Sequence, residues 1–109
     1  MSQSTESRFD DLVSTLLDTP GVSPPSPGAS GFGSHALKVD GRIFAMLVRG
    51  RLVVKLPARR VDDLVQHGEG ERFDAGKARP MREWLALDPS STMDWLALAR
   101  EALAFVRRT

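Results

Sequence analysis

The sequence holds two histidines, His35 and His67, the side chains best suited to acid–base chemistry or metal binding near neutral pH. It holds no cysteine, so disulfides, thiol catalysis and thiolate metal sites are excluded together. Asp62 and Asp63 are adjacent and point to different sides of a helix, so they do not form a general acid/base pair. We therefore expect ordinary surface histidines, no catalytic site, no metal site and no cofactor.

Basic residues interleaved with aromatic ones form a second set that could do chemistry. The basic members are Lys38, Lys55, Lys77, Arg79 and Arg82. Together with Phe73 and Trp84 they could bind a nucleic acid strand or a nucleotide through charge and base stacking. A tryptophan in a strand also suits a core, and a lysine at a sheet edge also discourages aggregation. The candidate binding residues are Lys38, Lys55, Arg79 and Trp84.

The stretch that must position these residues runs from residue 36 to residue 57 and reads as three short strands. Asp40-Gly41 predicts a two-residue type I′ turn, and Arg49-Gly50 predicts a second, weaker turn. Two-residue turns place Leu37 opposite Phe44, and Met46 opposite Val53. The face that we expect helices to cover then carries Ile43, Ala45, Leu47, Leu52, Val54 and Leu56.

The opposite face of these strands is also apolar, with charged residues at its margin. It carries Leu37, Val39, Phe44, Met46, Val48 and Val53, edged by His35, Arg42, Arg51 and Lys55. Either the chain covers this face with its own segments, or the face binds a second copy or a ligand, because large exposed apolar patches mark interaction sites. The candidate interface residues are Phe44, Met46, Val48 and Val53, with Arg51 at the rim.

Hydrophobic periodicity predicts the elements on either side of the strands. Residues 7–18 form an amphipathic helix capped by Ser7, and residues 19–30 form a proline-rich connector. A helix follows Pro57, a hairpin spans residues 70–87 with its loop at 74–80, and a last helix starts with Ser91 and Asp94. We expect one α+β domain over residues 1–109, of order α-β3-α-β2-α, with an antiparallel sheet and helices on one face.

A combination of short motifs between residues 31 and 87 resembles the TfoX N-terminal domain family. The motifs are Phe32-Gly33, Lys38-Val39-Asp40-Gly41, Phe44-Ala45, the run from Arg51 to Pro57, Phe73, Gly76, Arg79-Pro80-Met81 and Trp84. The resemblance implies a bacterial α+β domain similar to type III secretion chaperones, without established catalytic residues. The family is named for competence regulators that act with the cyclic-AMP receptor protein and carry a second, helical domain, for which this sequence has no room.

These observations lead to two expectations for function. The first is a non-enzymatic regulatory or protein–protein interaction module that binds another protein or itself, as a homodimer. The second is a nucleic-acid or nucleotide binder. A net charge of +1 favours neither. No apolar run approaches the ~20 residues of a membrane helix, and the polar, acidic N-terminus does not read as a secretory signal, so the expected location is the cytoplasm, away from membranes.

Overall fold

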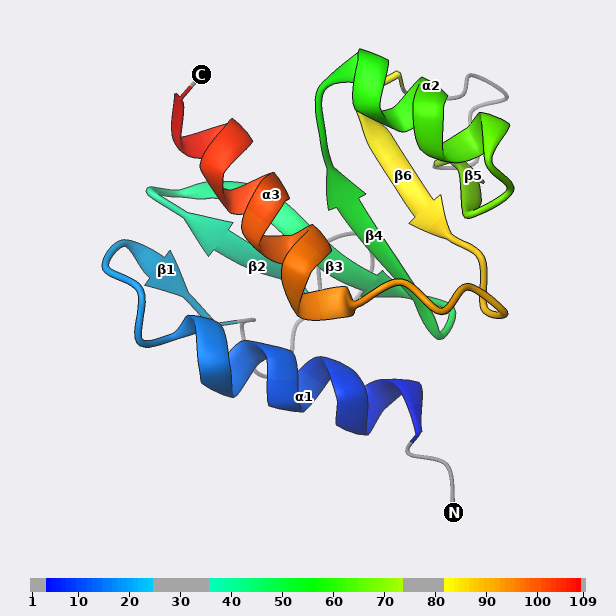
Figure 1. The fold of residues 1–109 in the computed structure, drawn as a ribbon. Helices are drawn as coiled ribbons and strands as arrows, with labels where there is room; N and C mark the ends of the chain where they lie inside the picture. Colours follow the sequence, from blue (N-terminus) through cyan, green and yellow to red (C-terminus); the bar gives the residue numbers. More distant parts are fainter. Residues whose placement is uncertain (1–3, 25–35, 74–81, 109) are drawn as a thin grey trace.

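The computed structural model describes residues 4–24, 36–73 and 82–108, in which three helices accompany one six-stranded sheet (Figure 1). The elements are α1 (Thr5–Leu16), β1 (Val22–Ser23), β2 (Ala36–Val39), β3 (Arg42–Val48), β4 (Arg51–Lys55), α2 (Ala58–Gln66), β5 (Gly70–Arg72), β6 (Trp84–Leu87) and α3 (Trp95–Arg108). The predicted α+β class is confirmed.

The strands follow the order β1-β2-β3-β4-β6-β5, and every neighbouring pair is antiparallel. The predicted three-strand meander and the later hairpin are joined by the pairing of β4 with β6. One strand was not predicted: Val22 and Ser23 lie within the expected connector and pair with Val39 and Lys38. Pro20 and Pro24 lie on either side of this segment, which forms only a two-residue edge strand, a position where proline neighbours are tolerated.

A bulge in β3 changes the predicted register of the first hairpin. Leu37 pairs with Ala45, and the next residue, Lys38, pairs with Ile43, so Phe44 is an extra residue on β3. The prediction that Leu37 faces Phe44 is therefore wrong. The second hairpin has no such irregularity, and the predicted pairing of Met46 with Val53 is confirmed.

The bulge also exchanges side chains between the two faces of the sheet. Consecutive residues Phe44 and Ala45 both belong to the cluster beneath the helices, which an unbroken strand would not allow. Leu37 and Val39 lie in the same cluster, whereas Ile43 packs against the cluster on the opposite face. The predicted faces are thus wrong at four positions on the first hairpin and hold for β4 and the end of β3.

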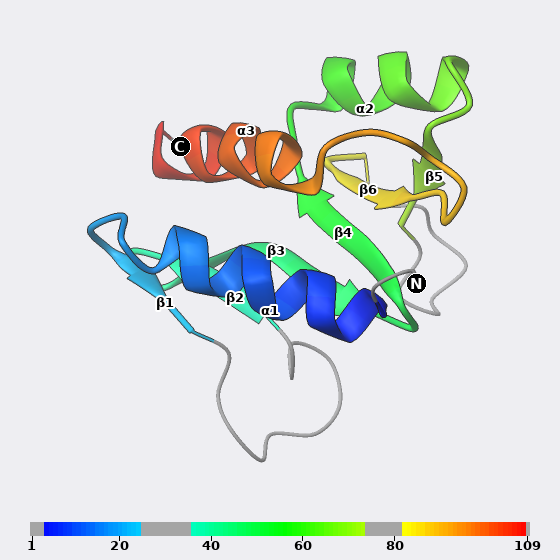
Figure 2. The same cartoon turned by 60° about the horizontal axis from the view of Figure 1, so that its bottom comes forward.

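All three helices cover the same face of the sheet, as predicted (Figure 2). Helix α1 contributes Phe9, Leu12 and Leu16 to the main core, and α2 contributes Val61 and Leu64. The largest contribution comes from α3, whose buried residues are Trp95, Leu98, Ala99, Ala102, Leu103 and Val106. None of the described helices combines the length and the apolar character needed to cross a membrane.

Side-chain caps set the starts of α1 and α3, whereas α2 begins after Pro57 without a side-chain cap. The Ser4 hydroxyl oxygen accepts a hydrogen bond from the backbone N–H of Ser7 at 3.1 Å, so α1 begins two residues before the predicted start and Ser7 is not its cap. The Asp94 carboxylate accepts from the N–H of Leu96 at 2.9 Å and begins α3. Predictions that involve Phe32, His35 and the 74–80 loop fall outside the described residues.

Candidate functional site

The predicted basic and aromatic set is only partly assembled. Lys55 and Trp84 are cross-strand partners, and the Lys55 ammonium lies 5.8 Å from the centre of the Trp84 ring. The ring itself is 9% exposed and belongs to the apolar cluster on the helix-free side, so it is a core side chain rather than a platform for a base. Lys38 lies on β2, separated from β4 by β3, and Arg79 is outside the described residues.

The helix-free face of the sheet is an apolar cluster already buried within the single chain. Its buried members are Ala36, Met46, Val53, Phe73, Trp84 and Ala86, with Ile43 and Val48 packed against them. Met46 and Val53, which we placed in an interface, are each 1% exposed. Phe44 is fully buried on the other face, because of the bulge, so its predicted interface position is wrong. Among the described residues, the large apolar side chains of this face are buried or half-buried, which leaves little apolar surface for a second copy to contact.

Arg51 is bound to the backbone of its own sheet instead of forming an interface rim. Its Nε donates to the carbonyl oxygen of Leu87 at 3.0 Å, and one terminal nitrogen donates to that of Ala86 at 3.1 Å. The other terminal nitrogen pairs with the Glu71 carboxylate at 2.7 Å. The Arg51 side chain therefore extends from β4 across β6 to β5 and links these three strands through hydrogen bonds and an ion pair.

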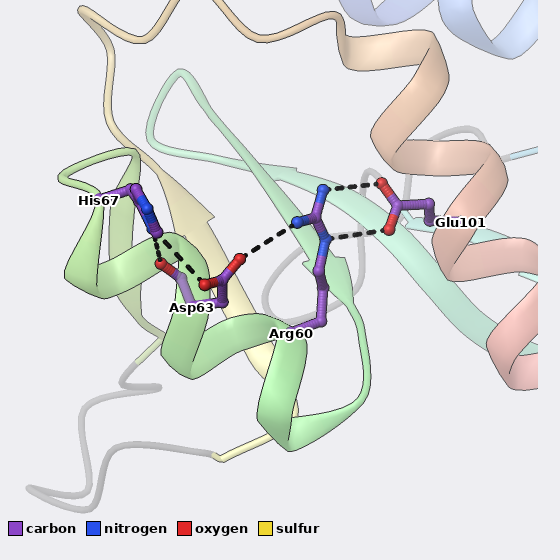
Figure 3. Close-up of polar contacts among 4 residues, drawn as sticks. All are labelled: Arg60, Asp63, His67 and Glu101. Carbon is purple, nitrogen blue, oxygen red and sulfur yellow. Dashed lines mark hydrogen bonds and ion pairs between the residues drawn. The ribbon is translucent and has the colours of Figure 1, made fainter.

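A chain of polar contacts joins α2 to α3 on the surface (Figure 3). Arg60 donates to both Glu101 carboxylate oxygens at 3.1 and 3.3 Å, and to Asp63 at 3.5 Å. His67 Nδ1 lies 2.7 Å from the backbone oxygen of Asp63. The Asp63 carboxylate lies 3.6 Å from the same nitrogen, a side-chain pair four residues apart on one helix that sequence reasoning missed. The His67 side chain is 67% exposed, so water surrounds it, as we expected for a surface histidine.

A hollow of about 370 Å³ lies between α1 and the start of α3. Its lining residues are Arg8, Asp11, Leu12, Thr15, Thr92, Met93, Asp94, Trp95 and Leu96, and we call it the α1–α3 groove. Apolar side chains from both helices lie beside polar ones, and the start of α3 passes close to α1 (Figure 1). The hollow is shallow and largely open to solvent, unlike the enclosed pockets that bury most of a small ligand.

Arg8 and Trp95, which both line this groove, contact each other. The Arg8 guanidinium lies 4.0 Å from the centre of the Trp95 ring, a cation–π distance. Trp95 is 8% exposed, and Arg8 is half-buried. Sequence reasoning missed this site. The apolar stripe of α1 predicts a buried face, but nothing in the sequence says which residue of α3 will meet Arg8.

The described residues hold no cluster of three or more histidines and acids that could bind a metal ion. Comparison of the chain with protein-family models, with curated proteins and with solved structures found no match in any of the three. The resemblance to the TfoX N-terminal domain therefore stays a prediction.

Proposed function

We propose that this chain is a non-enzymatic binding module that takes a segment of a partner protein into the α1–α3 groove. One observation carries the proposal: the groove places the half-buried side chains of Arg8 and Met93 at the surface, beside the buried ring of Trp95. Tryptophan, methionine and arginine are enriched in the cores of protein interfaces, whereas most surfaces are richer in lysine and glutamate. A regulatory role in the bacterial cytoplasm, as the TfoX resemblance implies, is part of the same proposal.

The alternative of nucleic-acid or nucleotide binding has weaker support. A base needs an exposed aromatic ring to stack on, and alanine substitution shows such stacking to be worth ~1–3 kcal/mol per base. The ring best placed by sequence, Trp84, is buried and has the Lys55 ammonium near it. Lys55 therefore lies beside a buried ring of the protein itself and not beside a ring that a base could stack on. For this reason we prefer a protein partner.

Site-specific photo-crosslinking followed by a binding measurement tests the proposal. A photoreactive phenylalanine analogue replaces exposed Thr92 in the groove or, as a control, exposed Gln66 on α2. Both proteins are irradiated in a lysate of the source organism. We expect one partner to be attached at position 92 and not at position 66, and mass spectrometry then identifies it.

The purified partner is next measured against two matched variants of α1. Thr15→Arg fills the groove, whereas Ser14→Arg adds the same side chain at the neighbouring exposed position outside the groove. We expect Thr15→Arg to weaken binding at least about tenfold, equivalent to ~1.4 kcal/mol, and Ser14→Arg to leave it unchanged. Equal affinity for both variants would show that the partner uses another surface.

A further inference from the structure

We propose that the α1–α3 groove selects a partner segment in which one carboxylate side chain lies close to one apolar side chain. The carboxylate binds Arg8, and the apolar side chain enters the groove beside Trp95. This inference rests on the proposed function and adds the chemistry of the partner. It is argued below from the state of Arg8, from the apolar lining and from the acids around them.

Arg8 offers unused hydrogen-bond donors at the edge of the groove. A guanidinium that stacks on an aromatic ring uses its flat face, and its five N–H donors remain in the plane. Arginines elsewhere in the fold use these donors on carboxylates, namely Arg51, Arg60, Arg72 and Arg107. Arg8 has no ion-pair partner among the described residues, and its guanidinium contacts the Trp95 ring. A carboxylate is the group that matches this fork with two parallel hydrogen bonds.

The apolar part of the groove lies next to that charge. Met93 and Leu96 are half-buried and pack against the main core, and Trp95 lies between them in sequence. An apolar side chain placed here would cover the parts of these residues that still contact water, and removal of apolar surface from water favours binding. The preferred segment thus combines an apolar side chain with the carboxylate. A carboxylate alone would contact only Arg8, and an apolar side chain alone would contact only the apolar lining.

Two acids that line the groove limit how acidic the segment can be. The Asp94 carboxylate accepts backbone N–H groups of Leu96 and Ala97 at 2.9 and 3.4 Å, so its charge is directed to the start of α3. Asp11 lies one helical turn after Arg8 on the same side of α1, and it is exposed. Asp11 would repel a second carboxylate that stands one or two residues away, along the partner segment, from the carboxylate bound to Arg8. We therefore expect a single carboxylate to bind better than an acidic run.

The two tryptophans of the chain provide a direct measurement. Trp95 lines the groove, and Trp84 lies on the helix-free side of the sheet, so their indole N–H signals in the NMR spectrum report the site and an internal control. Trp84→Phe assigns the two signals. The probes are acetylated, amidated nine-residue alanine–serine peptides in which leucine is followed, one to four residues later, by glutamate, glutamine, lysine or two glutamates.

With the full-length ¹⁵N-labelled chain, we expect the best single-glutamate peptide to shift the Trp95 signal and leave Trp84 in place. The glutamine and lysine peptides should bind at least about tenfold more weakly, and the double-glutamate peptide should also be weaker. Arg8→Gln should abolish the preference for glutamate. Arg8→Lys keeps the charge without the planar fork and should reduce the preference. Arg59→Gln, which removes an exposed arginine of α2 outside the groove, should retain it.

Three results would overturn the inference. Equal binding of glutamate and glutamine peptides would remove the role of the carboxylate while leaving the groove as a binding site. A shift of Trp84 without Trp95 would place the peptide elsewhere. Failure of every peptide to shift either signal would reject the proposed ligand chemistry, and the crosslink at position 92 would then decide separately whether the proposed function stands.

Discussion

Individual residues with left-handed backbone set both hairpins of the meander. Asp40 and Gly41 have φ values of +52° and +82°, and Arg49 and Gly50 have +52° and +76°. Positive φ at both central positions defines the type I′ turn, whose twist matches that of the flanking strands. The second turn therefore has the same form as the first, although arginine is less suited to this conformation than aspartate.

The Asp40-Gly41 turn can be tested without steric interference. A Cβ atom built on Gly41 meets no atom within 4 Å, so a side chain there costs only backbone strain. We expect Gly41→Val to lower the free energy of unfolding by ~1–3 kcal/mol, measured by urea denaturation. Gly41→Asn is the matched control, because asparagine tolerates positive φ, and it should cost less. Equal midpoints for valine and glycine would contradict the turn assignment.

Asp88 is a residue whose ionisation is tied to the turn before α3. The Ser90 hydroxyl and the Ser90 backbone N–H donate to its carboxylate at 2.7 and 2.8 Å, and these bonds lower the pKa of Asp88. Because the folded pKa lies below the unfolded one, any stability gained is present above the unfolded pKa and is lost as the pH falls through the folded pKa.

We expect Ser90→Ala to raise the pKa of Asp88 toward its ordinary value, because the larger of the two hydrogen-bond effects, that of the hydroxyl, is removed. The backbone bond remains, so the pKa should not return fully. A ¹³C NMR titration of the carboxyl carbon measures the change, with Ser14→Ala as the control. An unchanged Asp88 pKa in Ser90→Ala would show that the hydroxyl bond is not formed in solution.

At the scale of the elements, β6 holds the two halves of the sheet together. It pairs with β4 from the meander and with β5 from its own hairpin, so it lies between segments that are distant in sequence. All four of its residues are buried. Gly70 in β5 lies so close to this strand that a Cβ there would meet the backbone oxygen of Ala86. The strands β5 and β6 are therefore closely packed, and Arg51 binds the backbone at the end of β6.

We expect Arg51→Met to lower the free energy of unfolding by ~1–3 kcal/mol, because the carbonyls of Ala86 and Leu87 lose a charged donor while the apolar stem is kept. Glu71→Gln is the control. It removes only the exposed half of the ion pair and should change stability by less than ~1 kcal/mol. Both are measured by urea denaturation. Equal effects of the two variants would mean that the surface ion pair, and not the carbonyl bonds, is what Arg51 contributes.

At the scale of the whole molecule, the sheet separates two apolar clusters. The larger lies beneath the three helices, and the smaller lies on the other side around Met46 and Val53. Because both faces of β4 and β6 are buried, the centre of the sheet carries apolar residues on consecutive positions instead of an alternating pattern. Burial of the smaller cluster in the single chain removes the reason for the homodimer expected from the sequence.

We expect the chain to sediment as a monomer at high micromolar concentration in sedimentation-velocity runs. Met46→Glu should then destabilise the fold, since it places an unpaired carboxylate in a buried apolar site. Gln66→Glu makes the same kind of change at an exposed position of α2 and should have little effect. A parent dimer that Met46→Glu dissociates, with the melting temperature unchanged, would restore the homodimer and contradict this prediction.

The local features of this protein were predictable from its sequence. Asp40-Gly41 predicts its turn because few residue pairs accept positive φ at both positions. The spacing of Phe9, Leu12 and Leu16 predicts α1 because these residues share one side of a helix. Together with the buried face of α3, such signals are sufficient for the α+β class and the order of the main elements.

Tertiary packing decided the features on which the proposed function depends. The bulge at Phe44 has no local signal, and a single extra residue moves every side chain before it to the other face. The joining of β4 to β6 and the small edge strand β1 depend on partners far away in sequence. The same holds for the groove, because Arg8 and Trp95 are brought together only when two helices from opposite ends of the chain pack on one sheet.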